Sequence, residues 1–218
     1  HRLKDHVLLG GGTALSLGLL LIAPSMAAQG DSMEVLVAVL NTNFWLATHV
    51  VCITAAYATC IFTALLAHIE LYKGALTRKA KYSKTLLHKS SLVALFLTAF
   101  GTVLGGIWAD QSWGRFWGWD PKENGALVIV LWSAVLFHAR PGRMIGPRGF
   151  AAGSVLGVIC VLVAWLGVNL LGVGLHSYGF TSGIARGLAI TCALEVLFVA
   201  AVAPFARRAG APPPPVTG

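Results

Sequence analysis

The segment with the most unusual chemistry is Trp108-Ala-Asp-Gln-Ser-Trp-Gly-Arg-Phe-Trp-Gly-Trp-Asp-Pro-Lys-Glu-Asn. Four tryptophans fall within twelve of its residues: Trp108, Trp113, Trp117 and Trp119. A tryptophan belt at a membrane interface explains one or two of them at a helix end. It does not explain four in one loop together with Gly114 and Gly118, which let the backbone approach a large flat object. The segment favours a platform for a planar apolar ligand over a plain interfacial belt.

Two histidines add candidate metal ligands to this platform. His49 lies near the start of an apolar run, and His176 lies in a weakly charged loop. A single histidine in such a place is more often a hydrogen-bonded structural residue, but a neutral imidazole is also a good iron ligand. Haem is flat and apolar and carries two anionic propionates. Two imidazoles, aromatic walls and the cations Arg115 and Lys122 match each of these features.

Other ionisable residues lie in or beside apolar runs. His138 is either an intramembrane functional residue or an interfacial neighbour of Arg140, and the two interpretations weigh equally. Glu195 lies near the middle of an apolar run, so it must pair, take up a proton or face a polar cavity, and the sequence does not identify its partner. His68 and His88 flank a basic segment, and we expect both to be solvated interfacial residues.

The composition predicts that these residues are positioned by membrane helices. The 218 residues are 56% hydrophobic and only 11% charged, whereas a soluble domain is roughly a quarter charged. No alternating strand pattern is visible, so we expect an all-α polytopic transmembrane bundle. Six apolar runs predict six spans: Val7–Ala23, Phe44–Ile69, Ser91–Trp108, Gly125–Phe137, Phe150–Leu171 and Ile184–Ala203.

The distribution of charge predicts the orientation of these spans. Thirteen of the 16 basic residues lie at the two ends and in alternate connecting segments, which the positive-inside rule places in the cytoplasm. Both termini are then cytoplasmic, and the tryptophan-rich loop, His49 and His176 share the outer side. The net charge of +8 does not form a basic face with interleaved aromatics, so we expect no nucleic-acid partner.

The remaining features concern domain organisation. The four cysteines lie inside apolar runs without a C-x-x-C pair and are expected to be small buried residues. We expect residues 1–210 to form one integral membrane haem-handling domain and the proline-rich residues 211–218 to be a disordered tail. The chain starts at His1 rather than at methionine, which suggests an abbreviated protein or part of a longer polypeptide.

Four segments resemble the haem-handling superfamily of cytochrome c assembly, in the order that the family shows. The segment Trp113-Gly-Arg-Phe-Trp-Gly-Trp-Asp-Pro-Lys-Glu resembles its tryptophan-rich WWD motif, in the CcsA form rather than the CcmC form. The segment Trp45-Leu-Ala-Thr-His-Val resembles its first outer histidine segment. Phe137-His-Ala-Arg resembles its membrane histidine, and Gly174-Leu-His-Ser-Tyr-Gly its second outer histidine segment.

This resemblance implies a holocytochrome c synthase (haem lyase) subunit. It implies that haem b is held at the outer face by the axial ligands His49 and His176 and presented for thioether attachment to the CxxCH segment of an apocytochrome c. His138 would belong to a haem site within the membrane, with the opposing histidine supplied by a CcsB-type partner. Further haem contacts would come from the motif: Trp108, Trp113, Trp117, Trp119, Asp120, Arg115 and Lys122.

The resemblance also implies the setting of the protein. A thioredoxin-like protein would keep the client cysteines reduced. The membrane would be the cytoplasmic membrane of a bacterium or a thylakoid-like membrane, with the haem site facing the periplasm or lumen. A CcmC-like haem carrier without attachment activity is the main alternative. A quinone-cytochrome b subunit ranks third, because such proteins ligate haem with histidine pairs inside the helix bundle.

Overall fold

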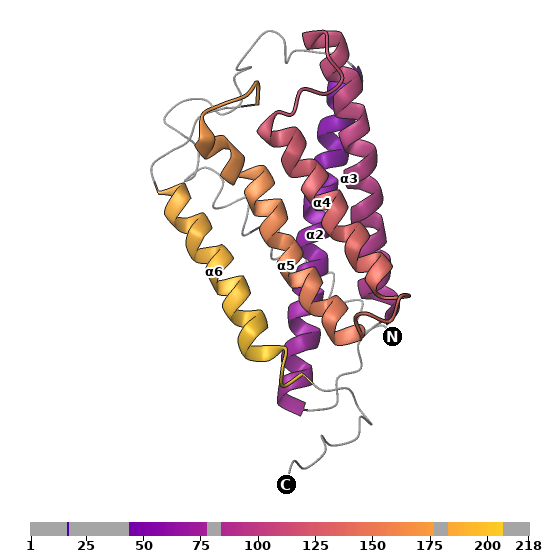
Figure 1. Cartoon of the computed structure of the whole chain (residues 1–218), viewed down its shortest axis with the longest axis vertical. Coiled ribbons are helices and arrows are strands. Elements are labelled where there is room, and N and C mark those ends of the chain that lie inside the picture. The colour runs from indigo at the N-terminus through magenta and orange to yellow at the C-terminus, as the bar shows by residue number, and fades with distance from the viewer. Residues whose placement is uncertain (1–16, 18–43, 78–83, 177–182, 207–218) are drawn as a thin grey trace. The chain divides into compact units, whose positions relative to one another are not determined.

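All regular structure in the described residues is helical (Figure 1). The computed structural model describes residue 17 and the ranges 44–77, 84–176 and 183–206. Its elements are α2 (Phe44–Thr77), α3 (Lys84–Trp113), α4 (Pro121–Ala139), α5 (Pro147–Trp165), the 3-10 helix η2 (Gly167–Leu171) and α6 (Ile184–Val202). The predicted all-α fold is confirmed. Apart from Leu17, the first predicted span lies outside the described residues, as does the 211–218 tail, so six spans and two cytoplasmic termini stay predictions.

Small residues let the helices pack closely. The buried residues of α2 include Ala56, Ala64, Ala67 and Gly74, and such residues allow neighbouring backbones to approach within a membrane. Helix α5 packs against α2, α3, α4 and α6, and Figure 1 shows it between α4 and α6. Its buried residues are Phe150, Ala151, Gly153, Ser154, Val155, Val158, Val161 and Ala164. The core of the described bundle therefore lies along α5.

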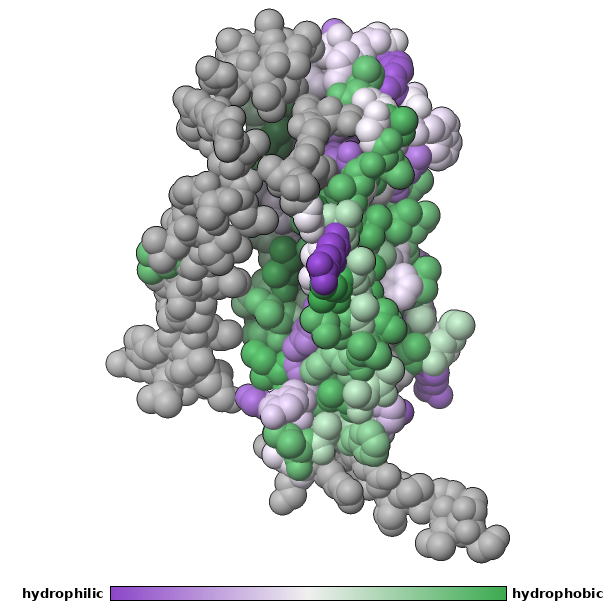
Figure 2. Space-filling model, turned by 90° about the vertical axis from the view of Figure 1, so that its left-hand side faces the viewer, coloured by the Kyte–Doolittle hydropathy of each residue, from purple (hydrophilic) through white to green (hydrophobic). Residues whose placement is uncertain are grey.

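Four helices are long and apolar enough to cross a membrane: α2, the Leu86–Trp113 part of α3, α5 and α6. Figure 2 shows a largely hydrophobic face along the described helices, with hydrophilic residues more frequent toward the two ends. Many large apolar side chains are exposed, including Phe96, Leu131 and Leu197, as expected for a lipid-facing surface. The chain therefore has the architecture of a polytopic integral membrane protein.

Helix α4 is longer than the apolar run that predicts it. The run covers Gly125–Phe137, whereas the helix begins at Pro121 and ends at Ala139, the same 19-residue length as α5 and α6. The additional first turn consists of the polar end of the tryptophan-rich motif. Asp120 caps this turn, Pro121 occupies a first-turn position and Glu123 completes a capping box, an arrangement that starts a helix efficiently.

Two expectations about ionisable residues are wrong. His68 is not a solvated interfacial residue, because its Nε2 lies 2.8 Å from Oε2 of Glu195 on α6. His88 is not solvated either, since its ring packs at 4.9 Å from the ring of Phe137 and at 5.7 Å from that of Phe150. The cysteines are partly buried and free of disulfides.

Candidate functional site

The four tryptophans form two separate pairs rather than one stack. The rings of Trp108 and Trp113 meet edge to face at 4.6 Å at the end of α3, and Trp108 is buried. The rings of Trp117 and Trp119 meet edge to face at 5.9 Å in the loop that follows. Trp119 is 69% exposed and has a φ of 57°, a left-handed conformation that is rare for a bulky residue. The outer pair, Trp117 and Trp119, thus offers apolar surface. The inner pair, Trp108 and Trp113, supports the loop from the end of α3.

Glu123 holds the tryptophan loop closed. Its Oε2 accepts hydrogen bonds from the backbone N–H groups of Gly118 (2.8 Å) and Asp120 (3.1 Å). Its Oε1 lies 3.4 Å from Nη1 of Arg115, whose guanidinium is also 6.0 Å from the centre of the Trp113 ring. A Cβ at position 118 would overlap the Arg115 guanidinium, so a larger residue there would displace this side chain from its present position. Arg115 therefore has partners within the loop in addition to any role toward a propionate.

Asp120 connects the tryptophan loop to the segment that carries His176. One carboxylate oxygen, Oδ1, accepts from the N–H of Lys122 at 2.9 Å and lies 3.1 Å from Nδ1 of His176. The other, Oδ2, accepts from the N–H of Leu175 at 2.6 Å. Burial alone would raise the pKa of Asp120, but the Lys122 N–H, the adjacent His176 and the Leu175 N–H together hold the pKa below its usual value. A buried ionised carboxylate can thus accept three hydrogen bonds here.

Gly174 makes this junction fit. Its φ is 89°, and an added Cβ would collide with Oδ2 of Asp120 and lie 2.9 Å from Cδ of Pro121. The loop can approach the start of α4 only because residue 174 has no side chain. Sequence reasoning used Gly174 for the family resemblance and did not anticipate this contact.

His176 is held in a defined orientation beside the inner tryptophan pair. Its ring meets that of Trp113 edge to face at 5.0 Å and 84°. Burial lowers the pKa of His176 below its usual value, although the charges of Asp120 and Glu123 and the Asp120 contact oppose this change. The imidazole is therefore neutral at neutral pH. Donation from Nδ1 to Asp120 places the lone pair on Nε2, the nitrogen that would ligate a metal.

His49 is oriented in a similar way from a different helix. It lies in the second turn of α2, and its Nδ1 is 2.7 Å from the carbonyl oxygen of Gly101 on α3. A carbonyl oxygen only accepts, so Nδ1 carries the hydrogen and the lone pair lies on Nε2. The imidazole ring packs against Gly105 of α3. A Cβ added to Gly105 would lie only 2.6 Å from Cε1 of His49. His49 and His176 are close enough for their charges to interact.

The structure does not bring His138 to this cluster. His138 lies near the opposite end of α4 from Asp120, which corresponds to roughly 25 Å along the helix. Its side chain is exposed, with Nδ1 2.7 Å from the carbonyl oxygen of Ala134.

Lys122 is close to the cluster, but its Nζ donates to the carbonyl oxygen of Trp165 at 2.5 Å. Burial lowers the pKa of Lys122 to about 8, while Asp120 opposes this change.

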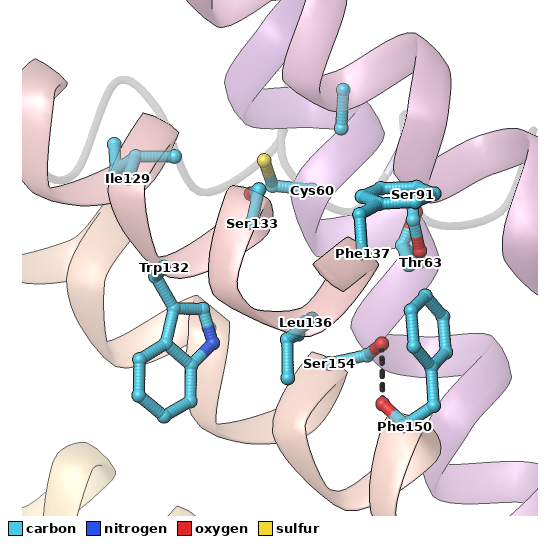
Figure 3. A pocket seen from close by; sticks show the side chains of 12 residues that line it. Cys60, Thr63, Ser91, Ile129, Trp132, Ser133, Leu136, Phe137, Phe150 and Ser154 are labelled. Atoms are coloured by element: carbon cyan, nitrogen blue, oxygen red, sulfur yellow. Dashed lines mark hydrogen bonds between the residues drawn. The ribbon is translucent and has the colours of Figure 1, made fainter. Parts of the chain in front are cut away.

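A cavity in the bundle core offers no second haem site. It has a volume of about 40 Å³ and is lined by twelve residues of α2 to α5, none of them histidine. Figure 3 shows that its polar lining includes Ser91, Ser133 and Ser154, with the Ser154 hydroxyl bonded to the Phe150 carbonyl. Ligand pockets usually have several hundred Å³, so this cavity does not have the size or the ligands for a macrocycle.

Three residues of the site were not predicted as functional: Gly105, Glu123 and Gly174. The order Asp-Pro-x-Glu in the motif is a helix-capping pattern and could have identified Glu123. Gly105 and Gly174 matter through contacts with residues far away in the sequence, and no local signal marks them.

Comparisons with known proteins show which proteins this chain resembles. A sequence model of the family described as "Cytochrome C assembly protein" matches residues 7–176. "Cytochrome c biogenesis protein CcsA" of Prochlorococcus marinus (strain MIT 9515) is 44% identical over 100 residues, which are 46% of this chain and 32% of the relative. The proteins of that name in Parasynechococcus marenigrum (strain WH8102) and Synechococcus sp. (strain CC9605) are 40% and 41% identical over 99 and 96 residues, 45% and 44% of this chain and 32% of each relative. The matched segments thus span about a third of these relatives.

Proposed function

The chain belongs to the cytochrome c assembly protein family, and we propose that it holds haem b at the outer face of the membrane between His49 and His176. The CcsA-type resemblance of the sequence is confirmed by the family match and by the relatives of that name. The observation that carries the proposal is the pair of imidazoles from separate elements, each oriented through Nδ1.

The chemistry of the donor set fits haem. Two neutral imidazoles whose lone pairs lie on Nε2 are suitable axial ligands for iron. Asp120 acts on His176 as an outer carboxylate acts on a metal-bound histidine, by fixing the tautomer and the ring orientation. The exposed Trp119 and Phe116 supply apolar surface beside the loop. The haem face can therefore be covered by aromatic groups while the iron is ligated from α2 and from the segment after η2.

The proposed reaction is thioether formation on haem as the substrate. Each cysteine thiol of an apocytochrome CxxCH segment adds across one vinyl group of haem, so a C–S bond forms and the thiol hydrogen ends on the neighbouring carbon. The thiolate is the nucleophile and comes from the client. The residues of this chain hold and orient the haem, which is catalysis by proximity. This assignment makes the chain a haem lyase subunit, without a catalytic base of its own.

Two partner proteins follow from the proposal. A CcsB-type membrane protein would face His138, which is exposed on α4, and would supply the opposing histidine of a haem site in the membrane. A thioredoxin-like protein would keep the client cysteines reduced. The membrane would be a bacterial cytoplasmic or thylakoid-like membrane, with the outer site toward the periplasm or lumen.

The first test is spectroscopic. The protein is purified in detergent with its CcsB-type partner, and oxidised and reduced visible spectra are recorded for the wild type, His49→Ala and His176→Ala. We expect a low-spin b-type spectrum that both changes abolish or shift. Thr48→Ala is the matched control, because the Thr48 hydroxyl bonds only to carbonyls of its own helix in the described contacts. A wild type without haem, or a spectrum indifferent to both histidines, would overturn the ligand assignment.

A second assay separates attachment from simple carriage. Haem-loaded protein is mixed with a reduced CxxCH apocytochrome, and covalent haem is detected on the client after denaturation. Covalent product supports the lyase assignment. Loaded protein that binds haem through both histidines and yields no covalent product would instead support the CcmC-like carrier.

A further inference from the structure

The loop between α4 and α5, residues 140–146, carries positive charge at the end of the bundle opposite the tryptophan loop (Figure 1). It contains Arg140 and Arg143, and Arg148 follows in the first turn of α5. No aspartate or glutamate occurs from residue 124 to residue 194. None of the ion pairs among the described residues includes these three arginines. Carboxylates of the described chain therefore do not neutralise their charges.

Backbone hydrogen bonds hold this α4–α5 loop in a compact turn. The N–H of Gly142 donates to the carbonyl oxygen of His138 at 3.2 Å, and the N–H of Met144 donates to that of Ala139 at 2.9 Å. Arg143 has a φ of 59°, a left-handed conformation that residues other than glycine rarely adopt. The loop therefore has a fixed shape and stays close to the ends of the two helices that it joins.

The length of α5 places the loop at the level of lipid headgroups. This helix has 19 residues and is apolar enough to cross a membrane, and its length corresponds to about 28 Å along the axis. The hydrocarbon core of a bilayer is about 30 Å thick, so the residues just before Pro147 lie at its boundary. Met144 is 81% exposed there, between the exposed cations Arg143 and Arg148. An apolar side chain flanked by cations suits a membrane interface better than bulk water.

The three guanidinium groups keep N–H donors for a further acceptor. Arg140 lies over the Phe150 ring, 5.1 Å from its centre, a contact that uses no N–H hydrogen bond. Arg148 uses one nitrogen, Nη1, for the carbonyl oxygen of Pro204 at 3.4 Å, and the described contacts include no hydrogen bond from the Arg143 side chain. A guanidinium has five N–H donors and can bind two phosphate oxygens at once.

We propose that the α4–α5 loop binds the phosphate of an anionic phospholipid through Arg140 and Arg143, with Arg148 beside them. A lipid fits better than a soluble acidic partner, because Met144 is exposed at the level where acyl chains begin. Anionic membrane surfaces attract such basic segments. The site lies at the opposite end of α4 from Asp120, so it is separate from the haem site. A bound lipid would hold the adjoining ends of α4 and α5 together.

Native mass spectrometry tests the choice of lipid. The full chain is released from detergent micelles that contain equal amounts of phosphatidylglycerol and phosphatidylcholine, and the retained lipids are counted. We expect the wild type to retain phosphatidylglycerol in preference. Arg143→Gln should lower this preference about fivefold, the effect of one cation beside an anionic surface, and R140Q/R143Q should lower it further. An unchanged preference in the double variant would overturn the proposal.

Arg186→Gln is the matched control for net charge. Arg186 is exposed in the first turn of α6, and Figure 1 shows the start of α6 at the other end of the bundle from this loop. Its replacement removes the same charge as Arg143→Gln but should keep the lipid preference. A loss as large as that in Arg143→Gln would show that the lipid responds to overall charge rather than to the loop, and the proposal would fail.

Thermal unfolding in vesicles supplies a second measurement. A ligand that binds only the folded state stabilises it, so the wild type should unfold at a higher temperature in vesicles with phosphatidylglycerol than in vesicles of phosphatidylcholine alone. R140Q/R143Q should lose most of this increase, and an increase equal to that of the wild type would contradict the proposal. Comparing two lipid compositions within each variant removes any loss of stability that the substitutions themselves cause. Neither measurement uses haem, so failure of this proposal and failure of the outer haem site are distinguishable.

Discussion

Replacing Asp120 tests whether one carboxylate both starts α4 and orients His176. Asp120→Ala removes the acceptor for the N–H groups of Lys122 and Leu175 and for Nδ1 of His176. Loss of the helix cap costs about 1 kcal/mol, and leaving the Leu175 N–H without its acceptor costs about 1–3 kcal/mol. We therefore expect the free energy of unfolding of the haem-free protein to fall by about 2–4 kcal/mol.

The effect on haem follows from the freed imidazole. Loss of an outer carboxylate next to a ligating histidine lowers metal affinity by about 10–100-fold. Haem is titrated into the haem-free protein, and affinity and low-spin character are read from the visible spectrum. Asp120→Asn should keep the helix cap, because the amide oxygen of asparagine can still accept from the N–H of Lys122. The amide NH₂ group cannot accept a hydrogen bond, so one of the two acceptor atoms of Asp120 is lost. Asp120→Asn should therefore be more stable than Asp120→Ala while still binding haem less tightly than the wild type.

Glu123→Gln is the control for damage to the loop. Glu123 contacts Gly118, Asp120 and Arg115 and makes no described hydrogen bond to His176. We expect it to lower stability with a smaller change in haem affinity. Wild-type haem affinity and spectrum in Asp120→Ala would refute the role of Asp120 in orienting His176.

Three further predictions concern neighbours of the site. Gly174→Ala should lower the free energy of unfolding by more than Gly172→Ala does. Both residues have positive φ, but only at position 174 would the added Cβ collide with Asp120 and Pro121. Denaturant unfolding of both variants measures the difference, and equal losses of stability would contradict the close packing at Gly174. Gly105→Ala should displace the His49 ring and shift the haem spectrum, whereas an unchanged spectrum would remove His49 from the site. For Lys122, burial lowers the folded-state pKa to about 8, whereas the unfolded value is near 10.4. Between these two pH values the unfolded chain binds more protons than the folded protein, so the free energy of unfolding should rise with pH. Unfolding curves should show this rise for the wild type relative to Lys122→Met, and identical pH profiles would contradict it.

Much of the fold was predictable because it depends on local composition. The apolar runs predicted the existence of α2, α3, α5 and α6, since the length and hydropathy of a span are properties of one segment. Their ends were less well predicted, because α2 ends eight residues after Ile69 and α3 begins seven residues before Ser91. The start of α4 was missed by four residues, because Asp120, Pro121 and Glu123 were considered as parts of a ligand motif rather than as a helix cap. Because these residues are polar, the apolar run did not include them, although their hydrogen bonds within the motif form the first turn of α4.

The contacts that orient the site were less predictable. The sequence indicated His49, His176 and the tryptophan loop as neighbours on one side of the membrane, and their role as haem contacts stays a prediction. It could not indicate that Asp120 reaches Leu175, 55 residues away, or that Glu195 pairs with His68. Both pairings depend on helix rotation and tilt, which composition does not determine.

The long reach of Asp120 also has a consequence for the order of assembly. The contacts of Asp120 with Lys122 and Glu123 are local and can form as soon as α4 does. The contact with Leu175 closes a loop that contains all of α4, α5 and η2, and closing a loop of this size is entropically costly and late. His176 is therefore oriented only after α5 has been placed in the bundle. If His176 is the second haem ligand, as proposed, a chain that ends before Leu175 would lack the contact that orients it, and haem capture at the proposed site would require the later helices.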